Sequence, residues 1–322
     1  MKRNIFIIIL LILLFVVIVI SLISGSVKTS LNELFSIFFN IKKEETDSGL
    51  IIFKIRLPRI FLAILIGGTL AVTGAMLQAI FKNPLVDPFI TGVSSGAAFG
   101  ATIAIIFKFY SITLFAIFGA VFTILFVYRL SVKNNNLNLY NLLLIGVMTG
   151  SFLSSLIMFL SAFFNRDMVK VIFWLMGDLS ITDIFLLKIS YIISLIIIIF
   201  CIYFSNDLNI LSLDEDEAKV SGVKTEFIKT FYFISSGILT GLSVSLSGVI
   251  GFVGLVVPHI VRFFIGPDLR MLIPFSFLTG SIFLLICDTI ARVAFAPAEI
   301  PVGIITGLFG APVFVALLIT RK

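Results

Sequence analysis

The sequence predicts an all-α integral membrane protein with about ten spanning helices, and three observations lead to that fold class. Of the 322 residues, 60% are hydrophobic and only 12% are charged, whereas soluble domains average about 25% charged residues. Long apolar runs recur along the whole chain and are separated by short polar or proline-containing segments. Several runs approach about 20 residues, the length that crosses a bilayer as a helix. We therefore expect residues 1–322 to form a single polytopic transmembrane domain.

The expected spans follow from the apolar runs and the breaks between them. They cover residues 4–23, 58–80, 89–107, 111–129, 140–164, 183–204, 228–247, 248–264, 272–292 and 302–320. The first run follows a basic start like that of a signal peptide, but no small-residue cleavage site comes after it, so we interpret it as a retained helix. We also expect a short amphipathic helix near Leu31–Phe39, a polar loop at 131–138 and an interfacial helix within 165–182.

The stretch from Gly241 to Asp268 has an unusual pattern for a membrane span. It is apolar, yet it contains three closely spaced glycines followed by Pro258. Glycine costs about 1 kcal/mol and interior proline about 3 kcal/mol relative to alanine in a helix. In hydrocarbon, the backbone groups that such residues free must find partners in neighbouring helices. We therefore expect two short helical pieces packed inside a bundle.

Several classes of catalytic and metal site are not supported by the sequence. It contains no G-x-x-x-x-G-K-[ST] pattern, so the chain does not bind ATP in the P-loop manner. The single histidine and the two cysteines, which lie in apolar runs, argue against a metal site or a disulfide framework. We predict no catalytic residues, no cofactor and no nucleic-acid partner; the net charge of +6 is better explained by basic residues that flank membrane spans.

Three sets of motifs carry a resemblance to a known family. The first is RLPR at 56–59 with GGTLAVTGAMLQAIFKNPLVDP at 67–88 and GVSSGA at 92–97; the second is FVGLVVPHIVR at 252–262 with GPDLR at 266–270; the third is DTIAR at 288–292 with EIPVGIITGLFGAPVF at 299–314. Together they resemble the FecCD/BtuC-type permease subunits of ABC importers for iron–siderophore complexes, haem and cobalamin. The resemblance covers residues 50 to 322, in order along the chain.

The resemblance implies a type II ABC importer permease in a bacterial or archaeal cytoplasmic membrane. Two such permeases, identical or homologous, would enclose a pathway for a metal-chelate substrate. Two cytoplasmic ATPase subunits would drive it, and an external substrate-binding protein would deliver the cargo. Both termini would be cytoplasmic and residues 41–48 external. The lysine and arginine counts on the two sides are nearly even, so the orientation comes from the resemblance and not from the positive-inside rule.

The polar segment 205–227 resembles the family's cytoplasmic coupling loop, in which two short helices fit a groove on the ATPase. The residues that match the family pattern and are expected to take part in coupling are Leu213, Glu215, Ala218, Gly222 and Val223. Asp214 stands where the family has glycine, and Ser221 where it has leucine. We expect Asp214 to act as a helix N-cap, a role that aspartate fills well. A solvated acidic loop without a coupling role is the alternative.

Two further groups of residues are candidates. The resemblance implies that Arg56, Arg59 and Arg292 dock the binding protein through its acidic residues, because arginine pairs bidentately with carboxylates. Headgroup anchoring is the alternative, and Arg292 can also pair with Asp288 one helical turn earlier. The second group forms a structural or gating motif. Its members are Asn83, Pro84, Pro88, Gly254, Pro258, His259 and Arg262.

The function that we expect is import of a ferric siderophore or haem, with cobalamin as the alternative within the same family. Two other classes compete with it. An ion-coupled secondary transporter requires acidic residues in mid-span, and the charges of this chain fall at span ends. A membrane enzyme that acts on lipid requires a cluster of histidine and acidic residues at an interface, and the chain has one histidine.

Overall fold

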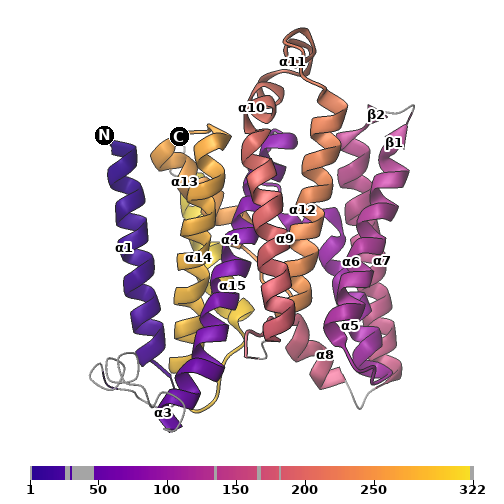
Figure 1. Ribbon diagram of the computed structural model, residues 1–322. Helices are drawn as coiled ribbons and strands as arrows, with labels where there is room; N and C mark the ends of the chain where they lie inside the picture. Colours follow the sequence, from indigo (N-terminus) through magenta and orange to yellow (C-terminus); the bar gives the residue numbers. More distant parts are fainter. Residues whose placement is uncertain are drawn as a thin grey trace.

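A computed structural model describes residues 2–25, 30, 47–133, 136–164, 168–180 and 183–319, and these residues are largely helical (Figure 1). The helices are α1 (Lys2–Ile23), α3 (Asp47–Leu50), α4 (Leu57–Ile80), α5 (Val93–Ile106), α6 (Ile112–Ser131), α7 (Leu139–Phe163), α8 (Met168–Leu175), α9 (Ile184–Tyr203), α10 (Ser205–Leu213), α11 (Glu215–Val220), α12 (Thr225–Ser247), α13 (Val253–Ile265), α14 (Leu269–Val293) and α15 (Val302–Ile319). A π-helix, η1 (Ile51–Arg56), runs into α4, and a 3₁₀-helix, η2 (Pro88–Thr91), precedes α5.

Each predicted span corresponds to a helix among the described residues. Seven helical segments are long and apolar enough to cross a membrane, and α5, α13 and α15 are shorter apolar helices. The span predicted at 89–107 was too long. The chain turns at Gly92, which has a φ of +76°, and α5 begins only after that turn. The correspondence confirms the predicted fold class.

Three predictions between the spans meet different outcomes. A helix, α8, is present within 165–182, where an interfacial helix was predicted, whereas the helix predicted near Leu31–Phe39 lies outside the described residues. The segment predicted as a plain loop at 131–138 carries a small antiparallel hairpin, β1 (Val132–Lys133) with β2 (Asn136–Leu137). We call this pair of strands the α6–α7 hairpin.

The structure also corrects the interpretation of residues 241–268 as two short helical pieces. The first piece is the last part of the long helix α12, and only α13 is short. Between them, residues 248–252 are not helical, and both Gly248 and Phe252 have a φ of +69°. The backbone N–H of Asp178 donates to the carbonyl of Ser247 at 2.8 Å, so a neighbouring segment satisfies part of the exposed backbone.

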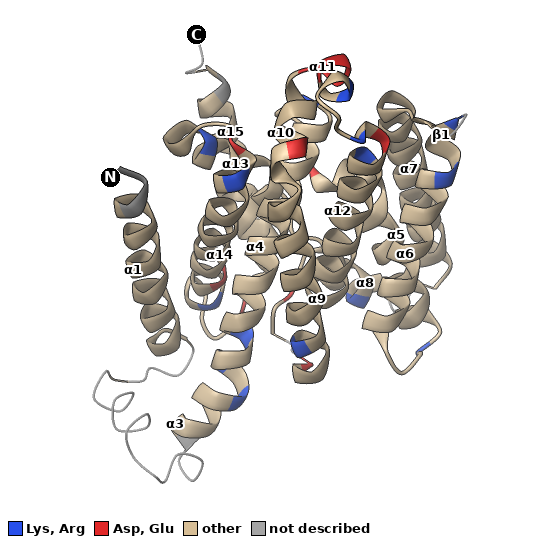
Figure 2. Cartoon of the chain, turned by 45° about the horizontal axis from the view of Figure 1, so that its top comes forward, with Lys and Arg blue, Asp and Glu red and all other residues tan. Residues whose placement is uncertain are grey.

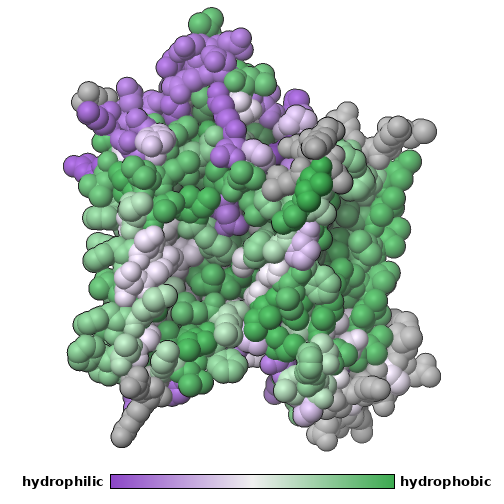
Figure 3. Space-filling view, turned by 180° about the vertical axis from the view of Figure 1, so that it is seen from behind, coloured by the Kyte–Doolittle hydropathy of each residue, from purple (hydrophilic) through white to green (hydrophobic). Residues whose placement is uncertain are grey.

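The two ends of the bundle differ. The start of α1 and the end of α15 lie at the same end as α10, α11 and the α6–α7 hairpin, whereas α3 and α8 lie at the other end (Figure 1). Charged residues gather toward these ends (Figure 2), and the space-filling view shows a broad hydrophobic band below a hydrophilic protrusion (Figure 3). We refer to the two ends as the α10–α11 end and the α3–α8 end.

Helix α4 is the centre of the bundle and packs against α12, α13 and α14. Twenty of its 24 residues are buried. Close approach depends on glycine, because a Cβ added at Gly67 would collide with the carbonyl of Gly280 on α14, and one added at Gly74 would collide with that of Gly254 on α13. Small residues of this kind allow helices to meet backbone to backbone in a membrane.

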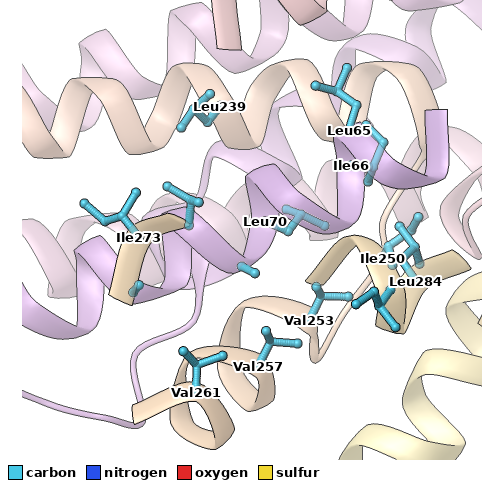
Figure 4. Close-up of a cluster of buried hydrophobic side chains, with 14 of the residues drawn as sticks. Leu65, Ile66, Leu70, Leu239, Ile250, Val253, Val257, Val261, Ile273 and Leu284 are labelled. Carbon is cyan, nitrogen blue, oxygen red and sulfur yellow. The ribbon is translucent and has the colours of Figure 1, made fainter. Parts of the chain in front are cut away.

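Two groups of helices share the apolar core. The larger group surrounds α4 and includes Leu65, Ile66 and Leu70, which pack with side chains from α12, α13 and α14 (Figure 4). The smaller group is formed by α5, α6, α7 and the α6–α7 hairpin, and Phe233 and Val244 connect it to α12. We call these the α4 group and the α5–α7 group, and α12 contributes to both.

Candidate functional site

Helices α10 and α11 lie at the hydrophilic protrusion at one end of the bundle (Figure 1 and Figure 3). The carboxylate of Asp214 accepts hydrogen bonds from the backbone N–H groups of Asp216 at 2.8 Å and Glu217 at 3.1 Å. These bonds hold the pKa of Asp214 below its ordinary value and confirm the predicted N-cap. At the other end of α11, Gly222 has a φ of +84°, and its N–H donates to the carbonyl of Lys219 at 3.0 Å. The two residues fix where α11 starts and stops.

The side chains predicted to take part in coupling differ in their exposure to solvent. Leu213 is 77% exposed, and Val220, which the sequence analysis did not select, is 90% exposed. Glu215 is half-buried, whereas Ala218 is fully buried and Val223 packs partly into the α4 group. Both apolar side chains are exposed to solvent on a polar protrusion. Leu213 and Val220 are therefore the apolar contacts that α10 and α11 offer.

Pro258 lies inside α13 without ending the helix. An interior proline cannot donate to the carbonyl four residues earlier, which is that of Gly254. The side-chain amide of Gln78 donates to this carbonyl at 3.2 Å and to that of Leu255 at 3.4 Å. Gly254 also lies against the ring of Pro88, 2.6 Å from where a Cβ would stand. Gln78 thus replaces a missing backbone donor, and its role here is packing between α4 and α13.

The remaining members of the structural motif gather near the α10–α11 end. Asn83, Pro84 and Arg262 line a cavity of about 220 Å³ between the end of α4 and the turn from α13 to α14. The side chain of Asn83 accepts from the backbone N–H two residues later at 2.9 Å, which makes the predicted turn a tight one. His259 is buried and meets Phe314 edge to face at 6.3 Å, as expected for a packing residue.

Arg56, Arg59 and Arg292 come together at the α3–α8 end, where they line a cavity of about 240 Å³. Their relative exposures are 4%, 5% and 4%, so all three are buried within the single chain. The sequence analysis placed these arginines at one surface and did not predict their burial. Arg56 donates to the backbone carbonyls of Leu22 and Ile23 at the end of α1. The docking role stays a prediction, and in this structure the guanidinium groups have partners inside the chain.

Two carboxylates balance part of this positive charge. Arg59 contacts Asp288 at 2.8 Å and Glu299 at 2.7 Å. The predicted pairing of Arg292 with Asp288 on α14 is confirmed at 3.2 Å, and Arg292 also donates to the hydroxyl of Ser21 at 2.6 Å. Asp288 is fully buried between two arginines. The cluster therefore fastens α1, α4 and α14 to one another at the α3–α8 end.

Two residues that form buried or inter-helix polar contacts were not predicted from the sequence. Lys229 is buried and paired with Glu226 three residues earlier, a spacing that indicates an ion pair on a helix. Asn209 on α10 donates to Asp268 at 2.8 Å and accepts from the N–H of Leu269 at 2.9 Å. The spacing from Glu226 to Lys229 was a usable signal, whereas the contact of Asn209 joins segments about 60 residues apart and leaves no local pattern.

The bundle of apolar helices with a polar helical pair at one end defines a multi-pass membrane protein. A model of the FecCD transport family matches residues 12–320, so the chain belongs to this family of ABC importer permeases. It is 36% identical to a probable iron chelatin transport system permease of Helicobacter pylori over 94% of both chains. It is 38% identical to the molybdate import system permease MolB of Haemophilus influenzae, over 84% of this chain and 82% of that one.

Two further comparisons extend this similarity. The cobalamin import system permease BtuC of Halobacterium salinarum is 39% identical over 83% of this chain and 73% of its own length. A solved structure of an ABC transporter assigned to the metal-chelate type, in an inward-facing conformation, superposes with a TM-score of 0.85 at 35% identity and 97% coverage of both chains. Permeases of this family are not themselves enzymes and work with ATPase and binding-protein partners.

Proposed function

We propose that this chain is the permease for a metal chelate, with a ferric siderophore or haem as the substrate. The observation that carries the choice is the similarity over nearly the whole chain to an iron chelatin permease and to a metal-chelate type transporter. Relatives named for cobalamin and molybdate are about equally similar. Cobalamin is the second candidate, and it is also a large metal complex.

In the proposed mechanism, two permease subunits enclose the pathway, and two ATPases bind α10 and α11 from the cytoplasm. The exposure of Leu213 and Val220 on a polar protrusion supports this role for the two helices. Both described chain ends lie at the same end of the bundle as α10 and α11, which supports cytoplasmic termini. ATP binding would displace the two helices and switch the bundle between inward and outward access.

We further propose that the external binding protein docks at the α3–α8 end, where Arg56, Arg59 and Arg292 line a common cavity. The support is electrostatic, because three guanidinium groups face two carboxylates, and one of these, Glu299, has a side chain that is 42% exposed. The surplus positive charge would favour an acidic partner and speed its encounter.

An ion-coupled transporter remains the competing class. It needs a carboxylate that can exchange an ion, and Asp288 is the buried carboxylate of α14. Its contacts with Arg59 and Arg292 favour a structural role, because charges inside a membrane protein are commonly paired with one another.

The test is uptake by cells with and without this gene, measured for labelled ferric siderophore, haem, cobalamin and molybdate in parallel. We expect gene-dependent, ATP-dependent accumulation of a ferric siderophore or haem. Accumulation of cobalamin or molybdate alone would replace the proposed substrate and leave the permease class intact. If uptake is lost when the membrane potential is dissipated while the ATP concentration is maintained, the result would instead favour ion coupling.

A further inference from the structure

A buried lysine joins three segments at the α10–α11 end. The ammonium group of Lys229 on α12 lies 2.7 Å from Glu215 on α11 and 2.9 Å from Glu226 on its own helix. The second oxygen of Glu226 accepts a hydrogen bond from the backbone N–H of Leu137 in the α6–α7 hairpin at 2.6 Å. The ion pair of Lys229 with Glu226 thus connects α11, α12 and the hairpin.

The burial of Lys229 makes these contacts strong. Its side chain is 6% exposed, and lysine is rarely buried unless it is paired. Hydrogen bonds between charged groups are about twice as strong as neutral ones. In agreement, the hydrogen bond from Lys229 is the main reason that the pKa of Glu215 lies below its ordinary value. The pair of Lys219 with Glu215, at 3.2 Å, joins two exposed parts of α11 and contributes little.

Helix α10 is attached to a different part of the bundle. Asn209 connects it to the first residues of α14, and the ammonium group of Lys82, just after α4, donates to the carbonyl of Leu213 at 3.1 Å. Leu208 and Leu211 bury their side chains in the α4 group. Helix α10 is therefore fastened to the α4 group by apolar and polar contacts together.

The apolar contacts of α11 are fewer. Ala218 is buried, but Val220 is almost fully exposed. A crevice of about 560 Å³ opens between α11 and the α6–α7 hairpin, lined by Lys133, Asn136 and Tyr140 among others. Lys229 and Glu226 also line this crevice, so they connect α11 and the hairpin across an open gap.

We propose that Lys229 is the positioning residue that links α11 to the α6–α7 hairpin, and through it to the α5–α7 group. Movement of α11 is then transmitted to the helices of the α5–α7 group, to which α10 is not attached. The inference rests on the proposed role of α10 and α11 as the ATPase contact. It assigns the two short helices different tasks: both pack on the α4 group, but α11 also has an ionic connection toward the α6–α7 hairpin.

The test measures the distance between α11 and the hairpin in the complete transporter. Spin labels are placed at Val220→Cys and Asn136→Cys, both exposed positions, in a background with Cys201→Ala and Cys287→Ala. The complex with its ATPases is studied in nanodiscs, resting and trapped with ATP and vanadate. With Lys229 intact we expect a narrow distance distribution in each state.

Lys229→Met should broaden the distribution about twofold, because the charge-assisted hydrogen bonds that hold α11 are gone. Lys229→Arg should restore the narrow distribution, and Lys224→Met, which removes an exposed lysine from the same region, should leave it unchanged. An unchanged distribution in Lys229→Met would overturn the proposal.

If Lys229→Met does not assemble, Glu215→Ala gives an independent test. It removes the α11 partner from the partly exposed side and keeps the contact between Lys229 and Glu226. We expect the same broadening, and a distribution like that of the parent protein would again overturn the proposal. The readout needs no transported chelate, so an incorrect substrate does not affect it. A label at Val220 that does not respond to the ATPases in any variant would instead contradict the proposed function.

Discussion

At the scale of single residues, Gln78 supplies a hydrogen bond that Pro258 removes from α13. In a membrane, an unsatisfied carbonyl has no water with which to form a hydrogen bond. The hydrogen bond from Gln78 to the carbonyl of Gly254, at 3.2 Å, therefore satisfies a group that would otherwise have no partner. Gln78 and Gly254 are 176 positions apart and meet because α4 and α13 pack closely at Gly74 and Gly254.

We predict that Gln78→Leu lowers the free energy of unfolding by about 1–3 kcal/mol, the cost of leaving a buried polar group unsatisfied. In a Pro258→Ala background the backbone N–H returns, so the same substitution should cost less than about 1 kcal/mol. Reversible unfolding in mixed detergent, followed by helical content, measures both values. Equal costs in the two backgrounds would show that Gln78 does not serve the carbonyl of Gly254.

Arg56 allows a test of docking that spares the fold. Because it is buried against backbone carbonyls, a charge reversal there would disturb the protein itself. Arg56→Gln keeps a donor and removes the charge. We expect it to slow association with the binding protein about threefold at low salt, since charge complementarity acts mainly on the encounter rate.

The effect of Arg56→Gln should fade toward physiological salt, where the Debye length is about 8 Å. Lys54→Gln, at an exposed position two residues away, is the matched control. Association rates in nanodiscs at several salt concentrations provide the measurement. An equal change of the association rate by both substitutions would indicate an effect of general surface charge. No change of the rate by Arg56→Gln would contradict the docking role and leave the arginines with a structural role only.

At the scale of elements, the turn after α11 depends on Gly222. Its φ of +84° is the left-handed region, and a Cβ added there would meet no atom within 4 Å. A side chain at this position would have enough space, so the backbone conformation is what restricts the choice of residue. L-residues other than glycine and asparagine carry a cost of about 1–2 kcal/mol in this region, and proline cannot adopt it.

Gly222→Pro should abolish ATP-driven uptake, whereas Gly222→Asn should retain most of it because asparagine tolerates the left-handed region. Protein abundance and binding-protein docking should be unchanged in both, since the turn lies at the opposite end of the bundle from α3 and α8. Uptake rates normalised to abundance give the comparison. Normal uptake by Gly222→Pro would remove α10 and α11 from the coupling mechanism.

At the scale of the whole molecule, the orientation in the membrane can be tested with exposed positions at the two ends. Most of the segment 41–48, predicted to be external, lies outside the described residues, which begin again at residue 47, so Tyr110 serves in its place between α5 and α6. It is fully exposed at the α3–α8 end, and Val220 is 90% exposed at the other. Both native cysteines are buried and can be replaced by alanine.

An impermeant maleimide should label Tyr110→Cys in spheroplasts and should label Val220→Cys only after permeabilisation. The expectation follows from cytoplasmic placement of α10 and α11 together with the chain ends. Labelling is read on gels, with total thiol content as the reference. The reverse pattern would invert the topology, and labelling of both positions would indicate leaky membranes and require intact vesicles.

The sequence by itself determined the fold class, the ten apolar runs, the family and the cap at Asp214. These features are local or linear: apolar length decides spanning, and an aspartate before a short helix satisfies its first N–H groups. Motif order along the chain carried the family resemblance without any knowledge of contacts.

Only the tertiary structure decided which polar residues belong together. Glycine contacts bring α4 against α13 and α14, and they place Gln78 at Gly254 and Arg59 at Asp288. The turn at Gly222 between α11 and α12 places Lys229 at Glu215. None of these pairings shows a sequence period, because each joins helices whose approach depends on packing in three dimensions. Burial then changes the role of the charges, since a charge removed from water needs a partner within the protein. The arginines that the sequence places in one surface patch instead form ion pairs and hydrogen bonds that join helices inside the bundle.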